Sequence, residues 1–286
     1  MADAVELTVG QAWFLAAILD AGSFPWVLAI TAGYTDASLA EDFAEQRRCE
    51  LRSLGVISAN DTVNTTVAQF IRQLCRPRQW LELRWVAGSG HMLRGAVSYT
   101  RGQVVVALQA GGLLAISRLG VEHPMDLVGV VTAGLAGRAP AGCADFSIPL
   151  RVGVKADERL RRGESLDRVS DYLGIPRSAR AVVAAAVAPD RHYVEIVAGE
   201  SCAGSRHQAE VGISIVDTTS GRLLVTPSRA FDGQWISTFT PGTATAIAHG
   251  VHRLTALLPG GPWFPQIALR SDSQQRMDER QCPMSP

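Results

Sequence analysis

The sequence has no excess of charge of either sign and almost no lysine. Its 286 residues include 27 Lys and Arg against 27 Asp and Glu, and Lys155 is the only lysine. A protein that binds nucleic acid or an anionic membrane usually carries a surplus of cationic side chains, because these neutralise phosphate. We therefore expect neither nucleic acid nor a membrane as a partner.

Long apolar runs are also missing. No segment approaches the roughly 18 uninterrupted apolar residues that indicate a membrane-spanning helix. The N-terminal segment opens with Asp3 and Glu6 rather than with the cationic residues of a secretory signal. With 47% hydrophobic and 19% charged residues, the composition is typical of a soluble globular protein. We expect a cytoplasmic location.

Cysteine pairs and the common catalytic motifs are absent from the sequence. The cysteines are odd in number and none belongs to a CxxC motif, which argues against a disulfide framework and a zinc site. The sequence also has no GxGxxG, Walker A, HExxH or GxSxG pattern. We therefore expect no cofactor, no metal and no enzymatic activity. The five cysteines are Cys49, Cys75, Cys143, Cys202 and Cys282.

Two weaker arrangements leave catalysis and metal binding open as alternatives. Cys202 and His207 lie in one glycine-rich segment, and a thiolate activated by a histidine is a known nucleophile. The alternative function is therefore a small intracellular hydrolase. His249 and His252 lie three residues apart on an expected helix and could ligate a metal, but no third ligand is near them in the sequence.

A further alternative is a DNA-binding regulator. Expected helices at 41–54 and 64–75, joined by a short connection, resemble a helix-turn-helix. The exposed side of the first helix carries Glu41, Asp42 and Glu45, whose negative charges would repel phosphate. This pattern disfavours DNA binding.

What the sequence does contain is an internal near-repeat. Residues 80–84 and 193–197 are both apolar/charged alternations centred on a glutamate. Each is followed by a glycine-rich connection, a second alternating run, a tight turn ending in glycine, and a helix behind a proline. Two such copies predict pseudo-two-fold symmetry from an internal duplication. We place the halves at 1–139 and 140–270 within a single domain, and expect 271–286 to be a disordered C-terminal tail.

The alternating runs indicate strands with one packed and one solvated face. Leu81, Leu83 and Trp85 share one face of the first such strand, and Glu82 and Arg84 share the other. This pattern is typical of antiparallel sheets, while the amphipathic stretches at 36–54 and 64–75 predict helices. We predict an α+β fold with a central antiparallel β-sheet flanked by helical bundles.

One face of the sheet expected in the second half carries small and polar residues. Glu210, Gly212 and Ser214 alternate on one strand, and Thr226 and Ser228 alternate on the next. Such a face suits the docking of a partner helix tip, whose last backbone groups need hydrogen-bond partners. Several aromatic residues also exceed the core pattern, and several exposed together would form a protein-binding patch. They are Phe24, Trp26, Phe231, Trp235, Trp263 and Phe264.

Several longer stretches resemble the EspG family, the ESX (type VII) secretion-associated proteins of mycobacteria. The matches include Phe24-Pro-Trp-Val-Leu-Ala-Ile30 and Asp171-Tyr-Leu-Gly-Ile-Pro176. The densest run begins at Glu210 and ends with the block Pro227-Ser-Arg-Ala-Phe-Asp-Gly233. The resemblance covers the chain up to about Phe264 and is strongest to the member that serves the ESX system linked with metal homeostasis.

The resemblance implies a cytosolic chaperone that binds PE–PPE heterodimers, mainly through the helical tip of the PPE subunit. Such a protein keeps the pair soluble and directs it to the secretion system. Residues 210–217 and 226–235 correspond to the family's client-facing sheet. We therefore predict these partner-binding residues: Glu210, Gly212, Ser214, Thr226, Ser228, Arg229, Phe231 and Trp235.

The sequence departs from the family in one place. Relatives often carry a long loop between the second and third sheet strands, which is thought to contact the client. Here Tyr99-Thr-Arg-Gly102 predicts a tight turn instead, and its contact with the client stays open. Exposed sheet edges are also compatible with a weak homodimer.

Overall fold

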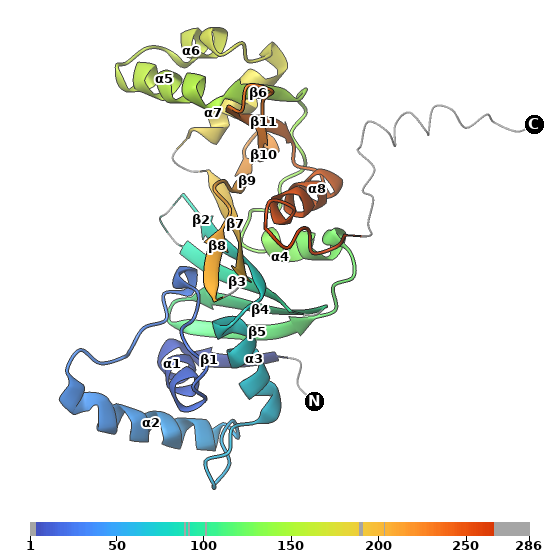
Figure 1. The fold of residues 1–286 in the computed structure, drawn as a ribbon. Helices are drawn as coiled ribbons and strands as arrows, with labels where there is room; N and C mark the ends of the chain where they lie inside the picture. The colour runs from blue at the N-terminus through green and yellow to red at the C-terminus, as the bar shows by residue number, and fades with distance from the viewer. Residues whose placement is uncertain are drawn as a thin grey trace, which may run out of the picture. The chain divides into compact units, whose positions relative to one another are not determined.

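The computed structural model describes residues 4–88, 90, 92–100, 102–188, 191–202 and 204–265, so the predicted tail at 271–286 lies outside the described residues. The chain forms antiparallel β-sheet with packed helices, which confirms the predicted α+β class (Figure 1). No helix of the described ranges is long and apolar enough to cross a membrane. The chain divides into two compact units. Unit 1 is Met1–Arg84, Met92–Val121 and Ala198–Gln208, and unit 2 is Trp85–His91, Glu122–Val197 and Ala209–Pro286.

Unit 1 contains a sheet with the strand order β1-β5-β4-β3-β2. Strand β1 pairs antiparallel with β5, β5 with β4, and β4 with β3. Strand β8 pairs with the part of β7 that belongs to this unit. The elements are β1 (Ala4–Thr8), α1 (Val9–Ile18), η1 (Trp26–Leu28), η2 (Ala37–Leu39), α2 (Ala40–Ser53), α3 (Thr65–Cys75), β2 (Gln79–Val86), β3 (Met92–Thr100), β4 (Gln103–Ala110), β5 (Leu113–Leu119) and β8 (Ser205–Gln208), together with the end of β7 (His192–Cys202), whose residues up to Val197 belong to unit 2.

Side-chain caps set where two helices of unit 1 begin. The hydroxyl of Thr8 accepts a hydrogen bond from the amide of Gln11 at 3.2 Å, and the Gln11 side chain accepts one from the amide of Thr8 at 2.9 Å. This reciprocal capping box fixes the start of α1. The Asn64 side chain accepts hydrogen bonds from the amides of Thr66 and Val67, so α3 begins where the sequence predicts.

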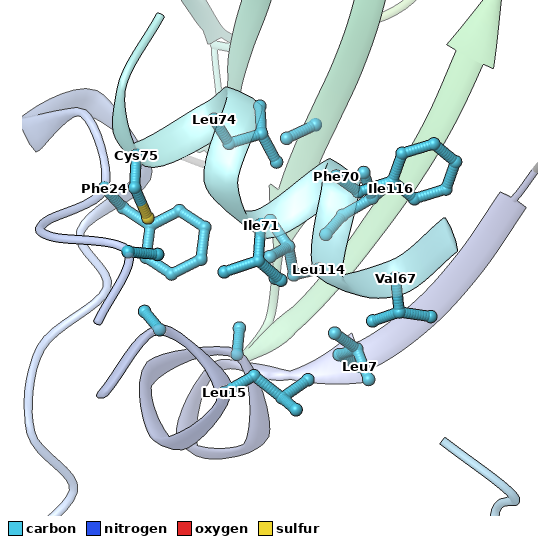
Figure 2. Packing of buried hydrophobic residues seen from close by; sticks show 14 of the residues in the cluster. Leu7, Leu15, Phe24, Val67, Phe70, Ile71, Leu74, Cys75, Leu114 and Ile116 are labelled. Atoms are coloured by element: carbon cyan, nitrogen blue, oxygen red, sulfur yellow. The ribbon is translucent and has the colours of Figure 1, made fainter. Parts of the chain in front are cut away.

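Helices α1 and α3 pack on one face of this sheet. Figure 2 shows Leu15 of α1 with Phe70 and Ile71 of α3, close to Leu114 and Ile116 of β5. Each of these side chains is at most 1% exposed. Full burial of a side chain of this size contributes about 1.5–3 kcal/mol. The cluster therefore holds both helices on the sheet.

Unit 2 contains a second antiparallel ladder with the strand order β7-β9-β10-β11-β6. The sequence predicts a single helix behind Pro124. Two short helices, η3 and α4, stand there instead, because the chain turns after Val131. The elements are η3 (Pro124–Leu127), α4 (Val128–Val131), β6 (Phe146–Pro149), α5 (Leu150–Arg161), α6 (Leu166–Tyr172), η4 (Arg177–Ala179), α7 (Arg180–Ala186), β9 (Ile213–Thr218), β10 (Gly221–Arg229), β11 (Trp235–Pro241) and α8 (Ala244–Thr255).

The two faces of the unit 2 sheet are covered by different helices. Gly250 of α8 lies against Leu224 and Thr226, so α8 covers the face that carries these even-numbered residues of β10. Leu223 and Phe146 point to the opposite face, where they pack with residues of α7 and of the segment before it. The second face is covered only in part, and its open part forms the groove described below.

The strands near residue 200 differ from the prediction. The sequence predicts a connection over Gly199–Gly204, but β7 continues to Cys202 and turns back into β8. Gly199 lies under the ring of Trp80, and a Cβ at this position would be 2.3 Å from that ring. This glycine therefore permits close packing within a strand rather than a turn.

The order of elements is similar in two stretches of the chain. Strand β1 is followed by α1, α2, α3 and then the strands from β2 to β5, while β6 is followed by α5, α6, α7 and then the strands from β7 to β11. In both stretches the first strand pairs antiparallel with the last. This recurrence supports an internal duplication, which stays a prediction. The single domain and its halves 1–139 and 140–270 also stay predictions.

Candidate functional site

An open groove of about 340 Å³ lies on the face of the unit 2 sheet that is opposite α8. The side chains of Val197, Val225 and Pro227 give it apolar walls, and Trp235 and Leu150 close its far side. Its volume is at the lower end of the range for binding pockets, which is roughly 300–1,000 Å³. It can hold a few side chains of another molecule. The lining residues are Leu150, Glu195, Ile196, Val197, Val211, Gly212, Ile213, Ser214, Val225, Thr226, Pro227, Trp235, Ile236 and Ser237.

The groove opens where the ladder between β9 and β10 stops. The last pair of this ladder is Ser214 with Val225. Ala230 donates its amide to Gln234 across the β10–β11 hairpin, so backbone groups of even-numbered residues in β10 face β11 and those of odd-numbered residues face β9. The nitrogen of Pro227 therefore faces β9 but has no hydrogen to donate. The ladder between β9 and β10 therefore ends before this proline.

Gly212 forms the other lip of this opening. A Cβ at this position would lie 2.7 Å from the carbonyl oxygen of Ile196, which no side chain can tolerate. The backbone around Gly212 therefore approaches β7 more closely than any other residue would allow. Glycine is required here for the shape of the groove.

Polar and aromatic side chains adjoin the groove. Arg229 donates a hydrogen bond to Glu210 at 3.0 Å, and its guanidinium lies 4.6 Å from the centre of the Trp235 ring. The side chains of Arg229 and Glu210 are 57% and 73% exposed, so this ion pair contributes little to stability. It balances the charge of Glu210 beside the groove. Phe231 lies fully exposed in the turn between β10 and β11.

The expectation that Thr226 and Ser228 share a face with Ser214 is wrong. The two-residue turn Thr219-Ser220 pairs Thr218 with Gly221, so even-numbered residues of β9 share a face with odd-numbered residues of β10. Thr226 is buried against α8, and Ser228 lies half-buried on that same side. Whether the predicted partner-binding residues contact a client stays a prediction.

Because even-numbered residues of β9 share a face with odd-numbered residues of β10, some residues that line the groove could not be predicted from the sequence. Of the predicted partner-binding residues, Gly212, Ser214, Thr226 and Trp235 are among those that line the groove, and Glu210 and Arg229 lie next to it. Val225 and Pro227 were missed because their face depends on the length of the turn before β10. Glu195 is the central glutamate of the alternating run at 193–197, a pattern that by itself indicates no binding role, and Leu150 is the first residue of α5. The sequence feature that could have placed Val225 and Pro227 on the correct face is the two-residue turn Thr219-Ser220.

The six aromatic residues do not form one exposed patch. Phe24, Trp263 and Phe264 are buried, at 6%, 2% and 8% exposure. Trp26 is 90% exposed on η1 of unit 1, and Phe231 is exposed on unit 2. Trp235 is half-buried in the groove. The six residues therefore do not form one combined patch, because half of them complete the cores.

The hydrolase alternative finds no support in the geometry of Cys202 and His207. They lie in the hairpin of β7 and β8 rather than in a loop, and they are not paired with each other. Cys202 lies opposite Ser205, and His207 lies opposite Glu200. Both are exposed on the hairpin surface. Burial raises the pKa of the Cys75 thiol to about 12, so that cysteine is not a nucleophile either.

The histidines of α8 do not form a metal site in the described part of the chain. No group of three or more His, Cys, Asp or Glu residues there could hold a metal ion. His252 is half-buried, and its Nδ1 atom is buried without a hydrogen-bond partner among the described residues. Burial lowers its pKa below the ordinary 6.5, and the nearby His249 and His123 lower it further.

Acid is expected to destabilise the protein partly through His252. A histidine with a lowered pKa in the folded state binds protons more readily when unfolded, so its stabilising effect is present above pH 6.5 and is lost as the pH falls through the lowered value. His252→Gln, which cannot be protonated, should lose less unfolding free energy than the wild type between pH 7.5 and pH 5. Urea denaturation at both pH values measures this. His207→Gln on the exposed β8 is the control, and an unchanged pH dependence in His252→Gln contradicts the expectation.

The helices proposed as a helix-turn-helix are not joined by a short turn. Residues 54–64 separate α2 from α3 and form a β-bridge between Ile57 and Val63. A DNA-binding helix-turn-helix uses a turn of about three or four residues. The exposed side of α2 also carries an ion pair of Arg48 with Glu45. This geometry does not favour DNA binding.

The predicted tight turn after Thr100 is confirmed. Thr100 pairs directly with Gln103, so only two residues connect β3 and β4. Gly102 has a positive φ of 80°, which a glycine adopts without strain. The connection is too short to form an extended contact loop.

Sequence comparison with known proteins identifies the family. The EspG family profile matches residues 8–253. The chain is 50% identical over 270 residues to the ESX-3 secretion-associated protein EspG3 of Mycolicibacterium smegmatis, covering 94% of this chain and 92% of that protein. It is 48% identical over 277 residues to EspG3 of Mycobacterium tuberculosis (strain CDC 1551 / Oshkosh), covering 92% and 94%. Identity to the ESX-1 secretion-associated protein EspG1 of M. tuberculosis (strain H37Rv) is 28% over 275 residues.

Comparison with solved structures also finds a protein named EspG5. The fold is similar to that of the M. tuberculosis type VII secretion system chaperone EspG5, which was solved in complex with a PE25–PPE41 dimer. The TM-score is 0.76 at 19% identity, and the match covers 91% of this chain and 99% of that one. This likeness establishes the shared fold. Together with the family profile over residues 8–253 and the high identity to the ESX-3 members, it leads to one conclusion: the chain belongs to the EspG family.

Proposed function

We propose that this protein is a cytosolic chaperone that binds PE–PPE heterodimers and directs them to a type VII secretion system. Its family membership and its similarity in fold to EspG5, which binds a PE25–PPE41 dimer, support the proposal. The observation that carries it is the open apolar groove on unit 2. The groove has the apolar walls and the size that suit side chains of another protein.

The groove offers a simple mechanism for keeping a client soluble. An exposed apolar helix tip on the PPE subunit would place its side chains against Val197, Val225 and Trp235. Burial of apolar surface contributes roughly 25 cal/mol per Å², so covering such a tip removes its tendency to aggregate. Glu210 and Arg229 beside the groove would then supply polar contacts around the buried centre.

Co-expression tests the proposed function directly. The full chain, co-expressed with PE–PPE pairs from the same genome, should elute with at least one pair as a single complex in size-exclusion chromatography. The bound pair should also stay soluble at concentrations at which the free pair precipitates. The proposal is wrong if none of these pairs co-elutes with the protein.

Trp235→Ala is expected to weaken client binding by about 30-fold or more, because a tryptophan at the centre of an interface typically contributes about 2 kcal/mol or more. Its ring lines the groove and holds Arg229 by a cation–π contact, and both features are lost in the variant. Isothermal titration calorimetry with a purified PE–PPE pair measures the change.

Trp26→Ala is the matched control, since Trp26 is 90% exposed on unit 1 and outside the groove. It should leave the affinity unchanged. Equal losses in both variants would contradict a role of the groove. Thr226, Ser228 and Phe231 remain predicted client contacts that the same assay can test one at a time.

A further inference from the structure

Glu195 places a carboxylate in the apolar groove. It lies on β7, paired across with Ser214 of β9, which is in turn paired with Val225 of β10. Directly paired residues of an antiparallel ladder point to the same face, so these three side chains form a row across the groove. Among the described residues that line it, Glu195 is the one titratable side chain.

Glu195 has no close cationic partner in the described part of the chain. Glu210 beside the groove has Arg229 as an ion-pair partner, but the Glu195 carboxylate forms no ion pair or hydrogen bond with any described residue. The hydroxyl of Ser214, its neighbour across the ladder, donates instead to the carbonyl of Val194 at 3.1 Å. In the free protein, water solvates the exposed Glu195 carboxylate.

Filling the groove changes the surroundings of this carboxylate. Apolar side chains that pack against Val197 and Val225 displace the water around Glu195. A charge that loses its water without gaining a partner opposes binding strongly. A client that fills the groove must therefore bring a donor for this carboxylate.

We propose that the groove selects clients that carry a cationic side chain beside their apolar anchor, and that this cation pairs with Glu195. This inference rests on the proposed function and specifies which part of a PE–PPE client the groove recognises. Arginine suits the position better than lysine. Its guanidinium is less strongly hydrated and can donate two hydrogen bonds to one carboxylate, while its aliphatic stem packs on the valines.

The test compares the affinity of a purified PE–PPE pair for the full-length wild type, Glu195→Gln and Glu195→Arg by calorimetry at 50 and 300 mM salt. Glu195→Gln should bind about 10-fold more weakly at low salt, and Glu195→Arg about 100-fold more weakly. The affinity of Glu195→Gln should also depend less on salt, because it lacks the charge pair. Glu41→Arg, on the exposed side of α2, is the control for charge reversal and should bind like the wild type.

The client side of the pair is tested in the same assay. Each arginine and lysine of the PPE helical tip is replaced by glutamine and measured with the wild type and with Glu195→Gln. One of these client substitutions should weaken binding to the wild type but have little further effect with Glu195→Gln, since the two changes remove the same interaction. A client substitution to glutamate at that position should restore binding to Glu195→Arg.

The outcomes separate this inference from the proposed function. If the wild type binds no PE–PPE pair, both are wrong. If the wild type binds but Glu195→Gln binds equally well, or more weakly with an unchanged salt dependence, only the inference is overturned. A urea denaturation curve for Glu195→Gln that matches the wild type confirms that the comparison concerns binding.

Discussion

Replacing Asp217 by alanine is expected to lower the free energy of unfolding by about 3–5 kcal/mol, the usual cost of removing one partner from a buried ion pair. The side chain of Asp217 is 0% exposed and accepts two hydrogen bonds from Arg222, at 2.6 and 2.9 Å. It also accepts one from the amide of Arg138 at 3.2 Å. The variant leaves the Arg222 guanidinium, itself only 12% exposed, without its counter-charge. Urea denaturation followed by circular dichroism measures the loss.

The double variant Asp217→Leu, Arg222→Met is the informative control. Apolar residues of similar size often replace a buried ion pair with little or no loss of stability. We therefore expect the double variant to be clearly more stable than Asp217→Ala. If both variants lose the same free energy, the penalty does not come from an unpaired buried charge. Glu45→Ala, which removes a solvent-exposed ion pair with Arg48, should leave the free energy of unfolding nearly unchanged.

The same carboxylate makes the protein sensitive to acid. Burial alone would raise the pKa of Asp217, but the hydrogen bonds from Arg222 and from the amide of Arg138 outweigh it and hold the pKa below its ordinary value of 3.8. Because the folded-state pKa is lowered, this stabilisation is complete above the ordinary value and is lost as the pH falls through the lowered one. The stability that depends on Asp217 is therefore lost at lower pH than the stability that depends on His252.

Phe70→Ala is expected to cost about 3–5 kcal/mol of unfolding free energy, the range for truncating a buried phenylalanine. Phe70 is 1% exposed between α3 and the sheet of unit 1, and its ring lies beside Ile116 in the buried cluster that also contains Ile71 and Leu114 (Figure 2). Arg118 also loses the aromatic face that lies 5.4 Å from its guanidinium. Urea denaturation gives the global change, and hydrogen exchange shows whether the amides of α1 and α3 lose protection.

Phe70→Leu is the matched variant, because it keeps most of the side-chain volume and should cost less than about 1.5 kcal/mol. A similar loss in both variants would show that the ring itself, rather than the filled volume, stabilises the cluster. No change in client affinity is expected for either variant at a temperature where both are folded, since Phe70 belongs to unit 1 and the groove to unit 2.

Features that depend on neighbouring residues could be predicted from the sequence. The alternation of Leu81, Leu83 and Trp85 gives one buried face of β2, at 0%, 0% and 2% exposure, because side chains of a strand alternate with a period of two. The start of α3 follows from Asn64, whose side chain caps it. Both signals lie within a few residues of the feature that they specify.

The residues that line the groove could not be predicted in full, because they depend on the register between neighbouring strands. The sequence of one strand does not specify that register. Ser214 and Thr226 each alternate correctly within their own strands, but which of them face the groove is decided by the turn between the strands. Glu195 lies on a third strand, and its place in the groove follows only after both ladders are known. The glycines were misleading in a similar way, since Gly199 permits close packing of a ring rather than a turn.

The proline that interrupts the β9–β10 ladder also protects the molecule from its own copies. A strand edge that an unfinished ladder leaves unpaired invites an extended chain to add itself as another strand, which is a common route to fibrils. Pro227 offers no amide hydrogen to such a chain, because its nitrogen carries none. The edge of β10 beside the groove is therefore a poorer template for an added strand than an edge without a proline.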